Sequence, residues 1–83
     1  MFTSDFIKKD IFEQGVRTNL GRDLQLPQSV ALAQCRFYFS EIYQMWVDGF
    51  SIEYTVSCLS MWVLENAKSD EDLRWYLQDR LAG

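Results

Sequence analysis

A long apolar stretch, residues 26–67, constrains the fold of this chain more than any other feature of the sequence. Its first half carries apolar residues at successive spacings of 3, 4, 3 and 4, namely Leu32, Cys35, Phe39, Ile42 and Trp46. Its second half carries a similar series, namely Ile52, Val56, Leu59 and Val63. Each series lies on one face of an α-helix, so the stretch predicts two amphipathic helices.

The residues around Gly49 predict a short turn between these two helices. Glycine readily adopts the left-handed conformation in which many helices end, so we expect the first helix to end at Asp48. Ser51 is a favourable N-cap for the second helix. A connection this short makes the two helices, at about residues 28–48 and 52–67, an antiparallel hairpin.

Shorter segments flank this hairpin. Residues 4–14 read as a short helix that ends at Gly15. Residues 15–26 contain a second glycine, Gly21, and are of mixed polarity, so we expect a loop with at most one turn of helix. A last helix is expected over about residues 70–81. The predicted fold class is therefore all-α, a small four-helix, bundle-like domain organised on the central antiparallel hairpin.

Size and composition limit both the fold and the location of the protein. A chain of 83 residues suffices for a single domain, residues 1–83, with one core but no enclosed substrate cavity. Acidic residues interrupt the hairpin before any apolar run reaches the roughly 20 residues that a membrane span needs. The N-terminal residues lack the apolar segment of a signal peptide, so we expect a cytoplasmic protein without membrane contact.

The sequence offers little for catalysis. It contains no histidine, the usual general base at neutral pH and the commonest metal ligand. Cys35 and Cys58 have no zinc-type spacing and read as free thiols, and no glycine-rich phosphate loop is present. We therefore expect no enzyme, no cofactor and no metal. Two alternatives stay open: the acids at residues 70–72 start a helix or hold a weak divalent ion, and Arg17 and Arg22 are solvated or grip an anion.

Aromatic residues supply the strongest functional signal, with 3 Trp, 4 Tyr and 6 Phe in the chain. Several of them, and Met61, occupy helix positions away from the predicted inward faces. Exposed aromatic residues beside acids are typical of protein–protein interfaces, although a neighbouring segment could also cover them. The predicted partner-binding residues are Phe37, Glu41, Asp48, Glu53, Tyr54, Met61 and Trp75.

Charge placement narrows the class of partner. The net charge is −4, and no basic residue lies between Arg36 and Lys68, so the hairpin lacks the positive surface that phosphate binding needs. We expect a non-enzymatic protein-binding module: a small acidic regulator or inhibitor that docks its aromatic patch on a partner protein, such as a basic nucleic-acid-binding one.

Two alternatives stand beside this hypothesis. Residues 49–57 contain a glycine turn of the kind found in helix-turn-helix DNA-binding motifs, but the following helix lacks the basic side chains for direct nucleic-acid binding. The same aromatic patch could also join two copies of the chain in a homodimer. We favour a different protein as the partner.

Overall fold

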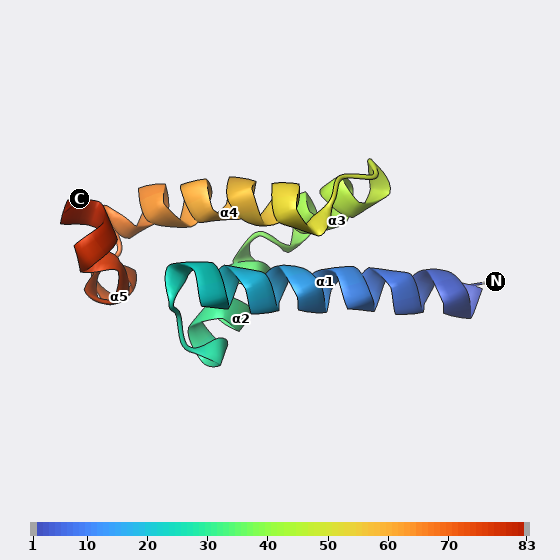
Figure 1. Ribbon diagram of the computed structural model, residues 1–83, viewed down its shortest axis with the longest axis horizontal. Coiled ribbons are helices and arrows are strands. Elements are labelled where there is room, and N and C mark those ends of the chain that lie inside the picture. Colours follow the sequence, from blue (N-terminus) through green and yellow to red (C-terminus); the bar gives the residue numbers. More distant parts are fainter. Residues whose placement is uncertain (1, 83) are drawn as a thin grey trace.

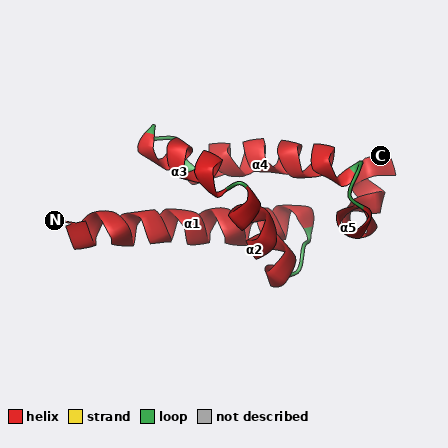
Figure 2. Cartoon of the chain, turned by 180° about the vertical axis from the view of Figure 1, so that it is seen from behind, coloured by secondary structure: helices red, strands yellow, loops and turns green. Residues whose placement is uncertain are grey.

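The computed structural model describes residues 2–82 of the chain and the side chains of residues 8–81. This part of the chain is helical nearly throughout and contains no strand (Figure 2). Its five helices are α1 (Phe2–Leu24), α2 (Gln28–Phe37), α3 (Phe39–Val47), α4 (Ile52–Ala67) and α5 (Glu71–Ala82) (Figure 1). The predicted all-α class is confirmed, but the predicted number of four helices is one too few. Among residues 2–82, no helix has the length and apolar character that crossing a membrane requires.

The first helix differs most from the prediction. The prediction of a short helix followed by a loop over residues 15–26 is wrong. α1 is one continuous helix of 23 residues that passes through Gly15 and Gly21. Its buried apolar side chains recur every four residues: Phe12, Val16, Leu20 and Leu24. The apolar face therefore continues across the predicted loop.

The two glycines of α1 mark close packing and do not end the helix. A Cβ atom added at Gly15 would lie 2.7 Å from Cδ1 of Ile52 in α4. One added at Gly21 would lie 3.4 Å from the Cβ of Ala31 in α2. Both positions let a neighbouring helix approach the α1 backbone, which is a tertiary requirement that a residue type alone does not reveal.

α1 ends instead at a left-handed residue that is not glycine. Gln25 has a φ angle of 54°. The N–H of Gln25 donates to the carbonyl of Arg22 at 3.3 Å, and the N–H of Leu26 donates to the carbonyl of Gly21 at 2.8 Å. This pair of bonds is the Schellman arrangement that commonly ends helices.

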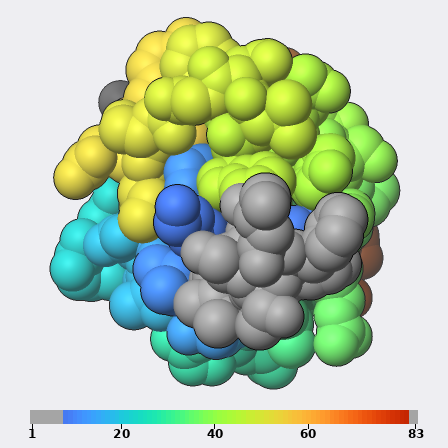
Figure 3. Space-filling model, turned by 90° about the vertical axis from the view of Figure 1, so that its right-hand side faces the viewer, coloured from blue at the N-terminus to red at the C-terminus, as the bar shows by residue number. Residues whose placement is uncertain are grey.

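The predicted turn before α4 is confirmed. Gly49 has a φ angle of 84°, which is the left-handed conformation expected of it. Ser51 caps α4, because its Oγ accepts a hydrogen bond from the N–H of Tyr54 at 3.1 Å. In the end view of Figure 3, α3 and the first turns of α4 lie together above α1.

The predicted continuous helix over residues 28–48 is divided at Tyr38, which has φ −100° and ψ 24°. No proline or glycine lies near this position, so the local sequence does not impose the break. Tyr38 instead reaches across to α4. Its hydroxyl donates to the carbonyl oxygen of Trp62 at 3.4 Å, and the two ring centroids are 5.6 Å apart. These tertiary contacts hold the chain where α2 gives way to α3.

The two helices at the centre of the fold are α1 and α4. They run side by side in the same direction (Figures 1 and 2) and are in extensive contact. α4 buries Val56, Leu59 and Val63, as predicted for its inward face, and α5 covers one end of the pair with Leu73 and Leu77.

The predicted central hairpin of residues 28–48 with residues 52–67 is not confirmed. The continuous α1 offers α4 a longer apolar face than α2 or α3 does, and it takes the central place. Of the predicted inward residues of the first hairpin helix, only Ile42 is buried, while Phe39 is 47% exposed. The division at Tyr38 explains this difference, because it turns the two halves of the predicted face in different directions.

Candidate protein-binding site

The predicted partner-binding side chains lie at the surface. Four of them are 51–70% exposed, namely Phe37, Tyr54, Met61 and Trp75. The three predicted acids are exposed as well, namely Glu41, Asp48 and Glu53. Neighbouring helices leave all seven accessible, but the residues come from α2, α3, α4, α5 and the turn before α4, so they do not form one patch.

The structure separates these residues into local groups. Tyr54 stacks on Phe50 beside the turn, with ring centroids 4.9 Å apart. Trp75 packs edge-on against Tyr76 on α5, also at 4.9 Å. Among the described residues, no aromatic contact links either group to Phe37. Phe37 contacts Tyr38, which lies at the division between α2 and α3 and in turn contacts Trp62 of α4.

A groove lies between the start of α3 and the second half of α4. It has a volume of about 510 Å³ and is lined by Tyr38, Glu41, Trp62, Glu65, Asn66 and Ser69. We call it the Tyr38–Trp62 groove. The rings of Tyr38 and Trp62, with centroids 5.6 Å apart, form its aromatic floor. Phe37 packs edge-on against Tyr38 at 4.9 Å but does not line the groove.

Two carboxylates stand beside this aromatic floor. Burial raises the pKa of the Tyr38 hydroxyl, and the nearby Glu41 carboxylate raises it further. Tyr38 is therefore a neutral donor at physiological pH. Glu65 pairs with Lys68 at 3.0 Å, but both side chains are mostly exposed. An exposed pair of this kind contributes little to stability, so Glu65 can exchange Lys68 for another cation.

Tyr38, Trp62 and Glu65 are absent from the predicted site. A signal for them exists, because an aromatic residue precedes a glutamate by three positions twice: Tyr38, the N-cap of α3, before Glu41, and Trp62 of α4 before Glu65. Residues three apart share a helix face, so each pair places a ring beside a carboxylate. The sequence pattern does not reveal that these two faces meet, because their meeting depends on the division at Tyr38.

A second aromatic surface, on α3, holds a cation from the chain itself. The Nζ atom of Lys9 lies 5.0 Å from the ring centroid of Phe39 and 5.9 Å from that of Tyr43. The same atom lies 2.9 Å from Oε1 of Glu13. Two rings and a carboxylate thus surround one ammonium group, which combines a cation–π interaction with an ion pair.

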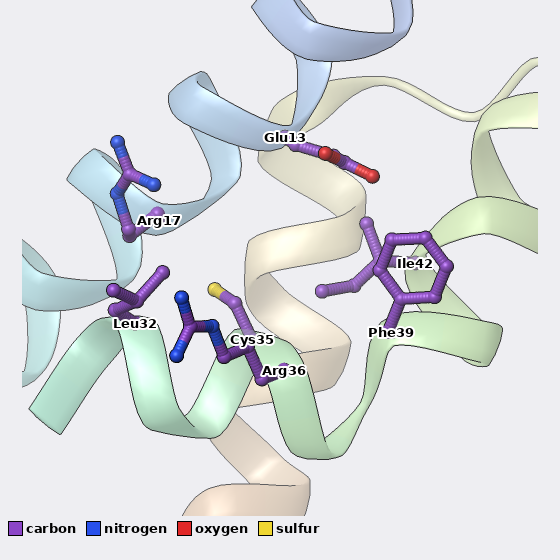
Figure 4. A pocket seen from close by; sticks show the side chains of 7 residues that line it. All are labelled: Glu13, Arg17, Leu32, Cys35, Arg36, Phe39 and Ile42. Atoms are coloured by element: carbon purple, nitrogen blue, oxygen red, sulfur yellow. The ribbon is translucent and has the colours of Figure 1, made fainter.

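A smaller cavity of about 210 Å³ lies between α1, α2 and α3 (Figure 4). Arg17 lines it, whereas Arg22 pairs with Asp23 at 3.6 Å and donates to Asn19. The anion grip suggested for Arg17 and Arg22 is therefore not assembled. Arg36 of α2 lies at the cavity with Arg17 instead.

The acids at residues 70–72 support a helix start. Asp70 caps α5, since its Oδ1 accepts a hydrogen bond from the N–H of Leu73 at 3.1 Å. Among the residues that the structure describes, no three Cys, Asp or Glu side chains gather in a set able to hold a metal ion.

Comparison of the chain with protein-family models, with curated proteins and with solved structures finds no match in any of the three. The function is therefore inferred from the geometry of this surface.

Proposed function

We propose that this chain is a non-enzymatic protein-binding module that docks its Tyr38–Trp62 groove onto a basic segment of another protein. A lysine or arginine of the partner would lie over the rings of Tyr38 and Trp62. Its charged end would meet the carboxylate of Glu41 or Glu65. A cation over an exposed aromatic face contributes about 0.5–1 kcal/mol, and more once water is excluded.

The observation that carries this proposal is the placement of both carboxylates, Glu41 and Glu65, beside a half-buried pair of aromatic rings that lines an open groove. The Lys9 cluster supports it, because there the chain surrounds a lysine with the same two chemical groups. The net charge of −4 adds a long-range attraction toward a basic partner.

Occlusion is the mode of action that suits so small a chain. By covering basic side chains of its partner, the module would prevent them from binding anything else. If the partner uses those side chains to hold nucleic acid, the chain acts as an inhibitor. The role of a small acidic regulator is the predicted one. The proposed binding site, however, is the Tyr38–Trp62 groove instead of the scattered aromatic residues.

Titration with a synthetic peptide that alternates arginine and lysine with serine tests the proposal. The matched ligand is the same peptide with citrulline and acetyl-lysine, which have a similar shape but no charge. We expect saturable binding of the charged peptide alone, measured by calorimetry or anisotropy, with an affinity that falls as salt increases. Trp62→Ala should weaken binding by about tenfold, which corresponds to about 1.4 kcal/mol.

Trp75→Ala is the matched control, because it removes another exposed indole that lies outside the groove. Glu41→Gln and Glu65→Gln should weaken binding and also reduce its dependence on salt. Equal binding of the uncharged peptide, or an equal loss in the Trp75 and Trp62 variants, would contradict a role for the groove.

The same experiments separate the two alternatives. A dimer in analytical ultracentrifugation that Trp62→Ala dissociates would favour the homodimer. Retardation of DNA at low salt would favour the helix-turn-helix reading, although α4 contains no lysine or arginine to contact phosphate.

A further inference from the structure

The cavity between α1, α2 and α3 differs from the groove in both charge and shape. It is lined by Glu13, Arg17, Leu32, Cys35, Arg36, Phe39 and Ile42. In Figure 4 the arginines lie on the Leu32 side of Cys35, and Glu13 lies on the opposite side near Phe39 and Ile42. The cavity therefore has a positive end and an apolar end.

The two arginines at the positive end have no carboxylate partner. Among the residues that the structure describes, the ion pairs within 4.0 Å involve other cations, and neither Arg17 nor Arg36 takes part in one. Of the side chains at residues 8–81, Glu13 is the one acid that lines the cavity, and its Oε1 is held by Lys9 at 2.9 Å. Two arginines without an ion-pair partner among the described residues thus line one cavity, in a chain that is acidic overall.

The remaining walls favour an apolar group. Leu32 and Ile42 present aliphatic side chains, and Phe39 adds an aromatic ring. Burial raises the pKa of the Cys35 thiol to about 11, despite an opposing effect of the Arg17 charge and with a smaller contribution from Glu13. Cys35 is therefore neutral at physiological pH and adds no negative charge that would repel an anion.

We propose that this cavity binds a small carboxylate with a short apolar chain. The carboxylate lies at the Arg17 and Arg36 end, where guanidinium groups donate paired hydrogen bonds to its oxygens. The apolar chain extends past Cys35 toward Ile42 and Phe39. A volume of about 210 Å³ is below the roughly 300–1,000 Å³ of pockets for drug-sized molecules, so the ligand is a free small acid.

A ligand titration of the full chain followed by ¹⁵N–¹H NMR tests this site. The probes are sodium hexanoate, hexan-1-ol, hexylamine and inorganic phosphate. We expect hexanoate alone to produce saturable shifts at the amides of Leu32, Cys35 and Ile42. Hexanol lacks the charge, hexylamine has the opposite charge and phosphate lacks the apolar chain, so each should bind at least about tenfold more weakly.

Variants locate the site and supply a second readout. Arg17→Gln and Arg36→Gln should each weaken hexanoate binding by about tenfold, which is the effect of one lost charged hydrogen bond. Arg74→Gln removes the same charge from α5 and should change nothing. Bound hexanoate should also slow alkylation of Cys35 by iodoacetamide.

Three outcomes would overturn the site: equal binding of hexanoate and hexanol, equal losses in the Arg74 and Arg36 variants, or shifts confined to other helices. None of them bears on the Tyr38–Trp62 groove, because the groove takes a cation and shares no lining residue with this cavity.

Discussion

Gln25 and Gly15 each occupy a position where ordinary residue preferences would favour the other type: glycine at the helix end and a residue with a side chain inside the helix. Gln25 is the left-handed residue at the end of α1, where glycine is usually found. Gly15 lies inside α1, where glycine costs about 1 kcal/mol relative to alanine. The reason is tertiary in both cases: the helix must remain open to Ile52 at Gly15, and its end is held by the hydrogen bonds around Gln25.

Gln25→Gly should stabilise the protein. A glycine adopts a φ angle of 54° without the steric cost that a side chain imposes, and both backbone hydrogen bonds stay in place. We expect the free energy of unfolding in urea to rise by about 0.5–1 kcal/mol. Gly49→Ala supplies the opposite control, because Gly49 has a φ angle of 84° and should lose stability on gaining a Cβ. A decrease for Gln25→Gly would show that the side chain itself stabilises the turn.

α1 is a helix whose length depends on the helices packed against it. Its core residues predict a helix through Leu24, but its two glycines predict interruptions, and packing decides between them. The division between α2 and α3 is the converse case. No local residue predicts it, and it accompanies the contact of Tyr38 with Trp62 on α4.

The packing of α1 on α4 gives a second prediction, a coupling between residues 15 and 52. Ile52→Val removes Cδ1, the one atom within 3.0 Å of a Cβ at position 15, and leaves the next two at 3.6 Å. In the Ile52→Val background, Gly15→Ala should therefore stabilise the protein by the helix-propensity difference of about 1 kcal/mol. In the wild-type background the crowding of Ile52 should reduce or reverse that gain.

A double-mutant cycle in urea measures this coupling. Gly21→Ala offers a comparison, because its nearest atom lies at 3.4 Å, an ordinary distance. If Gly15→Ala had the same effect in both backgrounds, the close approach of α4 to α1 would not be the reason for glycine at this position.

The whole molecule is elongated, with extents of 46 × 21 × 18 Å. A helix of 23 residues, such as α1, spans about 35 Å, so α1 sets much of this length. α3 contacts α1 less extensively than α2 and α4 do. Ile42 joins α3 to the core that holds the buried face of α1, and the Lys9 cluster is a second attachment between the two helices.

Lys9→Met tests this attachment. The change removes the charge beside Glu13, whose side chain is only 28% exposed, so a partly buried carboxylate loses its partner. We expect a loss of about 1–2 kcal/mol in the free energy of unfolding. Relative to the wild-type protein, amide hydrogen exchange should become faster in α3 by a larger factor than in α5. The further change Glu13→Gln should recover part of the loss.

Lys68→Met is the matched control for this prediction. Lys68 also pairs with a glutamate, at 3.0 Å, but both side chains are more than 60% exposed. Its loss should change stability by less than about 0.5 kcal/mol. Equal effects of the two lysine variants would mean that the aromatic rings and burial around Lys9 contribute nothing.

Local sequence patterns suffice to predict the helical class, the inward face of α4, and the turn at Gly49 with its Ser51 cap. Each of these follows from residues within a few positions of one another. The packing of the helices sets the length of α1, the division at Tyr38, the pairing of α1 with α4, the contact of Tyr38 with Trp62, and the exposure of Phe37, Tyr54, Met61 and Trp75. The physical reason is that spacing fixes the face that a helix buries, whereas the helix that covers this face depends on how closely two backbones can approach.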